Sequence, residues 1–172
     1  MTLEEELTQL CTRCGACCDG TLFAWVELDV NERTRHPPRR LPLVREGTGM
    51  VQPCEHHGGQ GCSIYGDRPA ACRSYRCALF DRHRDERGAI EPRLERVEKL
   101  RAVAARVRAL IAGPDDRDRG LWELLQRHAQ EDAAWLQRFP ELALDVAELA
   151  LRLRRDFGVK LPSDVPAKGS LE

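Results

Sequence analysis

The segment Cys11-Thr-Arg-Cys14-Gly-Ala-Cys17-Cys18 holds four of the eight cysteines of this chain. Its two-residue gaps let a tight turn bring the thiols of residues i and i+3 together, which is typical of zinc sites and of iron–sulfur clusters held by thiolates. Gly15 permits the left-handed backbone conformation that such a turn often needs. Because Cys17 and Cys18 are neighbours, their side chains diverge. They are poorly suited to bind one ion in the same way and could serve two different sites.

The other four cysteines follow with the wider spacing Cys54-x7-Cys62-x9-Cys72-x4-Cys77, and none occurs after residue 77. These gaps would be a weak signal alone, but together the two groups supply enough thiolates for two four-cysteine sites. One site with extra structural or redox thiols agrees equally well with the count. We predict that the metal ligands are Cys11, Cys14, Cys17, Cys18, Cys54, Cys62, Cys72 and Cys77, ahead of structural disulfides or buried free thiols.

The composition indicates a globular protein of one domain, or of one domain with a helical appendage. The chain has 172 residues, of which 42% are hydrophobic and 32% are charged. No stretch approaches the ~20 apolar residues of a membrane span, and residues 1–10 lack the features of a signal peptide. We therefore expect a cytoplasmic protein with no membrane partner. In that reducing compartment, clustered cysteines indicate metal binding before disulfides.

Nucleic acid is disfavoured as a partner because the cysteine-bearing part has no excess of positive charge. Residues 1–80 carry nine basic and ten acidic side chains. Proteins that bind nucleic acid depend strongly on Lys and Arg that neutralise phosphates. Metal ions are the predicted partners, and a peptide or a small molecule is a further candidate.

Several residues between and around the later cysteines are candidates for contacts with a bound cofactor. Arg68 and Arg73 can donate hydrogen bonds toward thiolates or carbonyls and offset the charge of a cluster, although surface ion pairing is an equally good explanation. Tyr65 either packs the loop or places its hydroxyl beside the site. His56 and His57 follow Cys54 and are candidate ligands or bases, but the glycines beside them favour exposure.

The cysteine pattern resembles a known family. The resemblance rests on Cys11-x2-Cys14-x2-Cys17-Cys18, followed by Cys62-Ser-Ile-Tyr65-x2-Arg68-Pro69-x2-Cys72-Arg73-x-Tyr75-x-Cys77. This combination is similar to the YkgJ-type CxxCxxCC cysteine-cluster family over residues 11–80, and all eight family cysteines have counterparts here. The resemblance implies chelation of zinc or iron and leaves the reaction open. Some relatives are larger enzymes, such as flagellin lysine methylases, whose activity we do not carry over to this short chain.

The part of the chain after Cys77 is predicted to be helical. Apolar residues at three- and four-residue steps predict helices over residues 95–112, 118–138 and 140–157. In the first part we expect a helical turn at 4–10, a strand at 21–28, a short helix capped by Asp29, a strand or hairpin within 41–51 and a flexible loop at 58–61. We also expect His83 and the charged run 115–119 to be solvated, and His128 to lie in or beside the core.

These observations predict an α+β fold with two parts. Residues 1–81 form a small, irregular, metal-organised cysteine-rich module, and residues 82–172 form an extension of about three packed α-helices. The predicted function is binding of zinc or iron as single ions, as a multinuclear site or as an iron–sulfur cluster. The alternative is a metalloenzyme whose redox or Lewis-acid centre acts on a peptide or small molecule. A closed all-cysteine site favours a structural role, whereas a histidine beside an open position favours catalysis.

Overall fold

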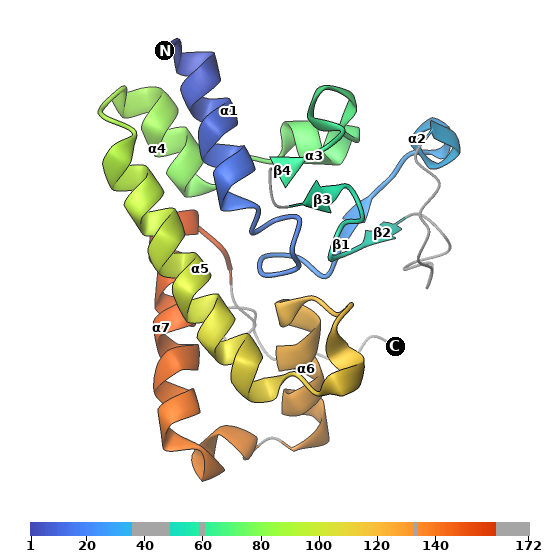
Figure 1. The fold of residues 1–172 in the computed structure, drawn as a ribbon, viewed down its shortest axis with the longest axis vertical. Coiled ribbons are helices and arrows are strands. Elements are labelled where there is room, and N and C mark those ends of the chain that lie inside the picture. Colours follow the sequence, from blue (N-terminus) through green and yellow to red (C-terminus); the bar gives the residue numbers. More distant parts are fainter. Residues whose placement is uncertain (36–48, 59–60, 133, 161–172) are drawn as a thin grey trace, which may run out of the picture.

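The computed structural model describes residues 1–35, 49–58, 61–132 and 134–160. Helices dominate, and two small antiparallel sheets accompany them, so the predicted α+β class is confirmed (Figure 1). The α-helices are α1 (Leu3–Cys14), α2 (Val30–Arg35), α3 (Ala70–Ser74), α4 (Ala78–Glu86), α5 (Glu91–Ile111), α6 (Leu121–Glu131) and α7 (Pro140–Phe157). Three short 3-10 helices are η1 (Tyr65–Asp67), η2 (Pro114–Asp116) and η3 (Trp135–Arg138).

The sheets are short and lie in the cysteine-bearing part. Strand β1 (Trp25–Glu27) pairs with β2 (Gly49–Val51), and β3 (His57–Gly58) pairs with β4 (Gly61–Cys62). The strand expected over 21–28 is therefore reduced to three residues, because the turn after Cys18 occupies its first half. Of the predicted hairpin at 41–51, only β2 falls within the described residues. The ends of the expected loop at 58–61 are paired strand residues, and 59–60 lie outside the described ranges.

The predicted helices are present, and local chemistry explains where they end. Gly158 adopts the left-handed conformation (φ 71°) that ends α7, and Asp29 caps α2 by accepting from the backbone N–H groups of Asn31 and Glu32. The helix expected over 118–138 is instead divided into α6 and η3. Asp132 leaves the helical region, and its carboxylate accepts from the N–H of Ala134, a local turn that competes with helix continuation.

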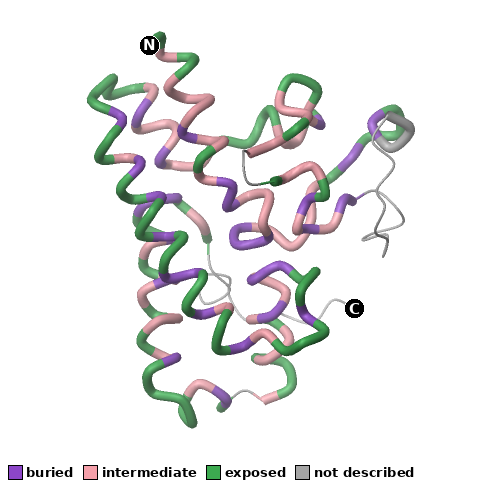
Figure 2. The backbone as a smooth tube through the Cα atoms, in the orientation of Figure 1, coloured by how far each residue is buried: buried purple, intermediate pink, exposed green. Residues whose placement is uncertain are grey.

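One hydrophobic core joins the two parts of the chain. Leu10, Ala16 and Leu22 pack in the same buried cluster as residues of α5 and α7, including Leu100 and Phe157. Buried positions recur along α5 and α7 and in the segment that follows α1 (Figure 2). The core is thus continuous across residue 81. No described helix has the length and apolar character needed to cross a membrane.

The expectation for His83 is wrong, and the expectation for the charged run 115–119 is wrong at Asp116 but correct at its other four residues, which are exposed. His83 is fully buried rather than solvated, and its Nε2 lies 3.0 Å from the carboxylate of Glu6, which links α4 to α1. Asp116 is only 4% exposed, and its carboxylate accepts two hydrogen bonds of 2.7 Å from Arg127. His83 and Asp116 are buried because partners elsewhere in the sequence, Glu6 and Arg127, fold against them. His128, by contrast, lies beside the core as predicted, where its Nε2 is 3.1 Å from the carbonyl of Ile111.

Candidate metal centre

The first cysteine motif begins on a helix rather than in a loop. α1 starts at a capping box in which Thr2 and Glu5 exchange hydrogen bonds, and it continues through Cys14. Cys11 and Cys14 are therefore neighbours because three residues make almost one helical turn. Gly15 then ends α1 in the left-handed conformation (φ 64°), as its place in the motif predicts. The chain turns back at this point and carries Cys17 and Cys18 away from the helix axis.

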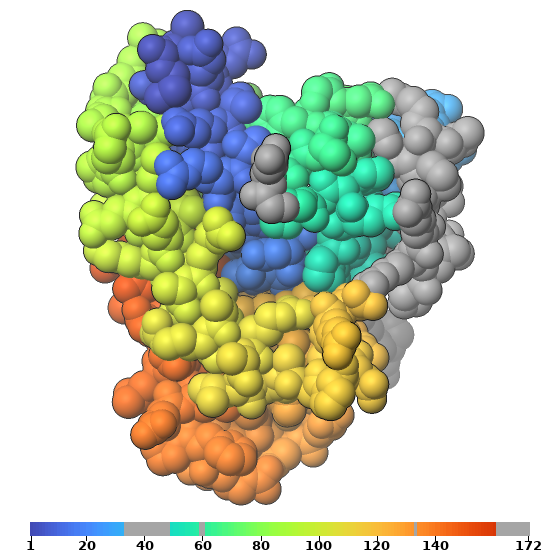
Figure 3. Space-filling view, in the orientation of Figure 1, coloured from blue at the N-terminus to red at the C-terminus, as the bar shows by residue number. Residues whose placement is uncertain are grey.

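The other cysteines come from separate elements that fold against this turn. Cys54 follows β2, and its backbone N–H donates to the carbonyl of Cys18 at 2.7 Å. Cys62 ends β4, Cys72 lies in α3, and Cys77 precedes the first residue of α4. β4 lies beside α1, so residues separated by some fifty positions in the sequence meet in space (Figure 3).

All eight cysteines are free thiols and line one cavity of about 330 Å³. Cys54 is buried and the others are partly buried. Much of the remaining wall is apolar or aromatic, including Leu10, Phe23, Tyr75 and Phe157. The structure therefore brings together every cysteine that the sequence predicts as a ligand.

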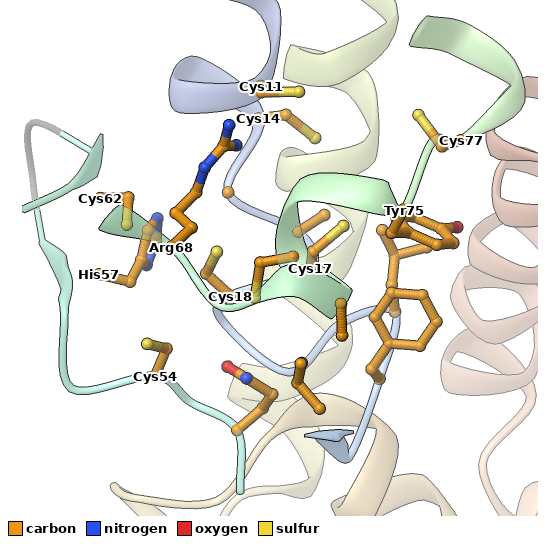
Figure 4. A pocket seen from close by; sticks show the side chains of 18 of the residues that line it. Cys11, Cys14, Cys17, Cys18, Cys54, His57, Cys62, Arg68, Tyr75 and Cys77 are labelled. Atoms are coloured by element: carbon orange, nitrogen blue, oxygen red, sulfur yellow. The ribbon is translucent and has the colours of Figure 1, made fainter. Parts of the chain in front are cut away.

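The thiols divide into two groups, which we call the first and the second quartet. The first quartet is Cys11, Cys14, Cys17 and Cys77, and the second is Cys18, Cys54, Cys62 and Cys72. In Figure 4 the first quartet lies on one side of the cavity, and Cys18, Cys54 and Cys62 lie on the other. Each quartet thus combines members of both sequence motifs.

The electrostatics of the thiols follow the same division. Burial, and then the charge of Cys77, raises the pKa of Cys11 to about 11. Burial raises the pKa of Cys14 to about 12, with Cys77 and Cys11 contributing in the same direction. In the second quartet, burial and then Cys54, Cys62 and Cys72 raise the pKa of Cys18 to about 12. The thiols of each quartet are therefore close enough to repel one another when ionised.

These properties fit the binding of a thiophilic metal. Thiols with such high pKa values are protonated at neutral pH, and a bound cation would displace their protons. Clustered thiolates are the ligands preferred by zinc and by iron–sulfur clusters. Within the described ranges, no three Cys, His, Asp or Glu donors already converge closely enough to hold a single ion. The quartets are groups of neighbouring donors rather than closed coordination spheres.

Backbone amides also face some of the sulfurs. The N–H groups of His56 and His57 lower the pKa of Cys54 against the larger effect of its burial. The N–H groups of Phe80 and Leu79, in the first turn of α4, act on Cys77 in the same way. Amide donors of this kind stabilise the negative charge of a thiolate and tune a bound metal.

Two of the three predicted cofactor contacts line the cavity. The Arg68 guanidinium lies 3.5 Å from the centre of the Tyr65 ring, and the Tyr65 hydroxyl is hydrogen-bonded to the Cys11 thiol, which lowers the pKa of that thiol. Arg73 is exposed and does not line the cavity. Its guanidinium donates to the carbonyl of Arg68 at 2.7 Å, so it contacts the site only through that backbone group.

The two histidines differ in position. His57 lines the cavity, and its ring lies so close to Gly15 that a Cβ on Gly15 would be 2.3 Å from Nε2. His56 does not line the cavity, and its Nε2 lies 4.0 Å from the carboxylate of Glu55. The pairing of β3 with β4 sets this difference, because it places His57 directly opposite Cys62.

The sequence analysis did not identify Gln52 as a site residue. Its side chain is 1% exposed and lines the cavity, and its Oε1 has no hydrogen-bond partner among the described residues. Tyr75, which belongs to the family motif, also lines the cavity. Burial, and then Cys17, raises its pKa, and its ring packs edge-on against Phe23. The Gln52 sequence neighbourhood contains no signal that would have indicated its burial beside the thiols.

One protein-family model matches the cysteine-bearing part of the chain. The model of the CxxCxxCC family, described as "Putative zinc- or iron-chelating domain", matches residues 10–96. This range contains all eight cysteines and reaches into α5. The comparisons with curated proteins and with solved structures gave no match. With its cysteine motif at the end of α1 and four further thiols folded against it, the chain belongs to the CxxCxxCC family.

Proposed function

We propose that this protein binds two metal centres, one at each thiol quartet, and that both are iron–sulfur clusters. The observation that carries the proposal is the division of eight free thiols into two neighbouring sets of four around one cavity. Four cysteines are the usual ligand set of a [2Fe–2S] or [4Fe–4S] cluster and also of a structural zinc ion. All eight cysteines are then ligands.

The space around the thiols favours clusters over single ions. A tetrahedral zinc site holds its four sulfurs at about 2.3 Å from the ion, and no three donors in the described ranges are that well gathered. A cluster bridges more widely spaced thiolates and fills the space between them with iron and sulfide. The cavity of about 330 Å³ offers such space, whereas two zinc ions would require both quartets to contract.

The composition of the purified protein tests this proposal. We expect anaerobically purified full-length protein to contain iron and acid-labile sulfide in equal amounts, with two clusters per chain and a broad absorption near about 400 nm. If the protein is instead colourless and contains two zinc ions per chain, both sites exist but hold zinc rather than clusters. A folded protein that purifies without either metal would contradict metal binding at the quartets.

A catalytic role is the second candidate, and the position of His57 is the observation that favours it. His57 lines the cavity among the thiols, and an imidazole beside a metal centre can bind or position a substrate. The apolar wall would then take a peptide side chain or a small molecule. We place this function in the cytoplasm, whose reducing conditions keep all eight thiols free for metal.

The two adjacent histidines provide a matched test of the catalytic candidate. His57→Ala should alter the spectrum or metal content if His57 contacts the centre, while His56→Ala, away from the cavity, should change neither. If both variants keep the wild-type spectrum and metal content, chelation without participation of His57 is the better account.

A further inference from the structure

Arg68 occupies a position shared by the two quartets. It lines the cavity, and its guanidinium is fixed by stacking 3.5 Å above the Tyr65 ring. In Figure 4 the guanidinium points toward Cys11 and Cys14, while the base of the side chain lies on the side of Cys18 and Cys62. One side chain therefore reaches both groups of thiols.

The hydrogen-bonding capacity of Arg68 is not used up by its surroundings. Its Nε is buried and has no hydrogen-bond partner among the described residues. A buried guanidinium N–H without an acceptor is destabilising, and thiolates or cluster sulfides are acceptors that would satisfy it. The positive charge of Arg68 acts on Cys11 in the first quartet and on Cys72 in the second, where it opposes the effect of burial on both thiols.

Two metal centres in this cavity would repel each other. Four thiolates around a zinc ion or a [4Fe–4S]²⁺ cluster leave each centre with two net negative charges. Cys17 and Cys18 are adjacent in the chain, so the two centres would be near neighbours in a largely apolar environment. Repulsion between them is strong at low dielectric, and a cation between them would offset it.

We propose that Arg68 is a positioning residue shared by both quartets, whose positive charge couples the two centres and allows both to be occupied at once. This inference rests on the proposed function, and it adds that the centres are energetically dependent on each other through one side chain. Arg73, although near in sequence, has no such role because it is exposed and lies outside the cavity.

Stepwise removal of metal from the purified holoprotein tests the coupling. Wild-type protein, Arg68→Gln and Arg68→Lys are titrated with a competing chelator, and the metal remaining per chain is measured. In Arg68→Gln we expect the more weakly held centre to be lost at a chelator concentration on the order of tenfold lower, the effect of removing one nearby unit charge. Arg68→Lys keeps the charge and should stay close to wild type.

Two further measurements separate coupling from a merely structural role. Arg117→Gln removes an exposed arginine away from the cavity and should titrate like wild type, and helical circular dichroism should be unchanged in every variant. If the centres contain iron, loss of the Arg68 charge should also make the reduction potentials of both centres more negative. If Arg68→Gln loses metal at the same chelator concentration as wild type and keeps the wild-type reduction potentials, the inference is wrong. A wild-type chain that holds fewer than two centres would contradict the proposed function, and the coupling with it.

Discussion

Cys17 and Cys18 are joined by a single peptide bond, yet their thiols belong to different groups. Burial and then Cys14 raise the pKa of Cys17, whereas Cys18 responds to Cys54, Cys62 and Cys72. The two thiols are nevertheless close, since the charge of Cys18 also raises the pKa of Cys17. The backbone between them is therefore the shortest covalent link between the two proposed centres.

Substitution of these two residues should remove different centres. We expect Cys17→Ser to weaken or abolish the first centre and Cys18→Ser the second, with each variant retaining about half of the wild-type metal. Elemental analysis of the two purified variants, together with Cys14→Ser and Cys62→Ser as second members of each quartet, checks the assignment. If Cys17→Ser and Cys62→Ser removed the same centre, the division into quartets would be wrong.

Metal removal should loosen the cysteine-bearing segments more than the long helices. The reason is that α5 and α7 bury Leu100, Val107 and Leu153 in a core against which the proposed ligands Cys14, Cys17 and Cys77 pack while only partly buried. Chelation under reducing conditions should therefore create new protease cleavage sites within residues 11–18 and 49–77. Helical circular dichroism should fall only in part, and returning the metal should restore resistance. Unchanged protease resistance after complete metal removal would show that metal does not organise these segments.

Replacing Gly15 should damage both the turn and the site. Gly15 has φ 64°, and a Cβ there would lie 2.3 Å from Nε2 of His57. Gly15→Ala should destabilise the fold by about 1–3 kcal/mol, because the left-handed conformation is strained for alanine and the His57 ring must move. Denaturant unfolding of the holoprotein measures the effect. Gly66→Ala is the control, since nothing lies within 4 Å of a Cβ there. Equal effects of the two substitutions would contradict this explanation.

Asp116 should contribute to the acid sensitivity of the protein. Hydrogen bonds from Arg127, and then from the backbone N–H of Gly113, lower the pKa of its carboxyl. Since the folded-state pKa is below that of an unfolded Asp, about 3.9, this stabilisation is complete at neutral pH and is lost as the pH falls through and below that value. Asp116→Asn should lower the melting temperature at pH 7. The melting temperature of this variant should then fall less than that of wild type when the pH is lowered. Asp115→Asn, at an exposed neighbour, should do neither.

Short-range patterns predicted much of the fold. Apolar residues at helical spacing indicated α5 and α7, and Asp29, Gly15 and Gly158 act at the turns and helix ends where their local chemistry places them. These features depend on residues only a few positions apart, so one sequence is enough to detect them. The same holds for the predicted chemistry of the site, because eight cysteines in 67 residues favour metal binding by thiols wherever they fold.

Only the tertiary structure decided how these thiols are grouped. The sequence presents one tight motif and one loose one, but Cys77 joins the first motif and Cys18 joins the second, because α4 packs against α1 and the Cys54 backbone bonds to Cys18. The burial of His83 depends on Glu6, more than seventy residues away. Such contacts arise when distant segments bury a common core, and their geometry is not contained in the spacing of residues along the chain.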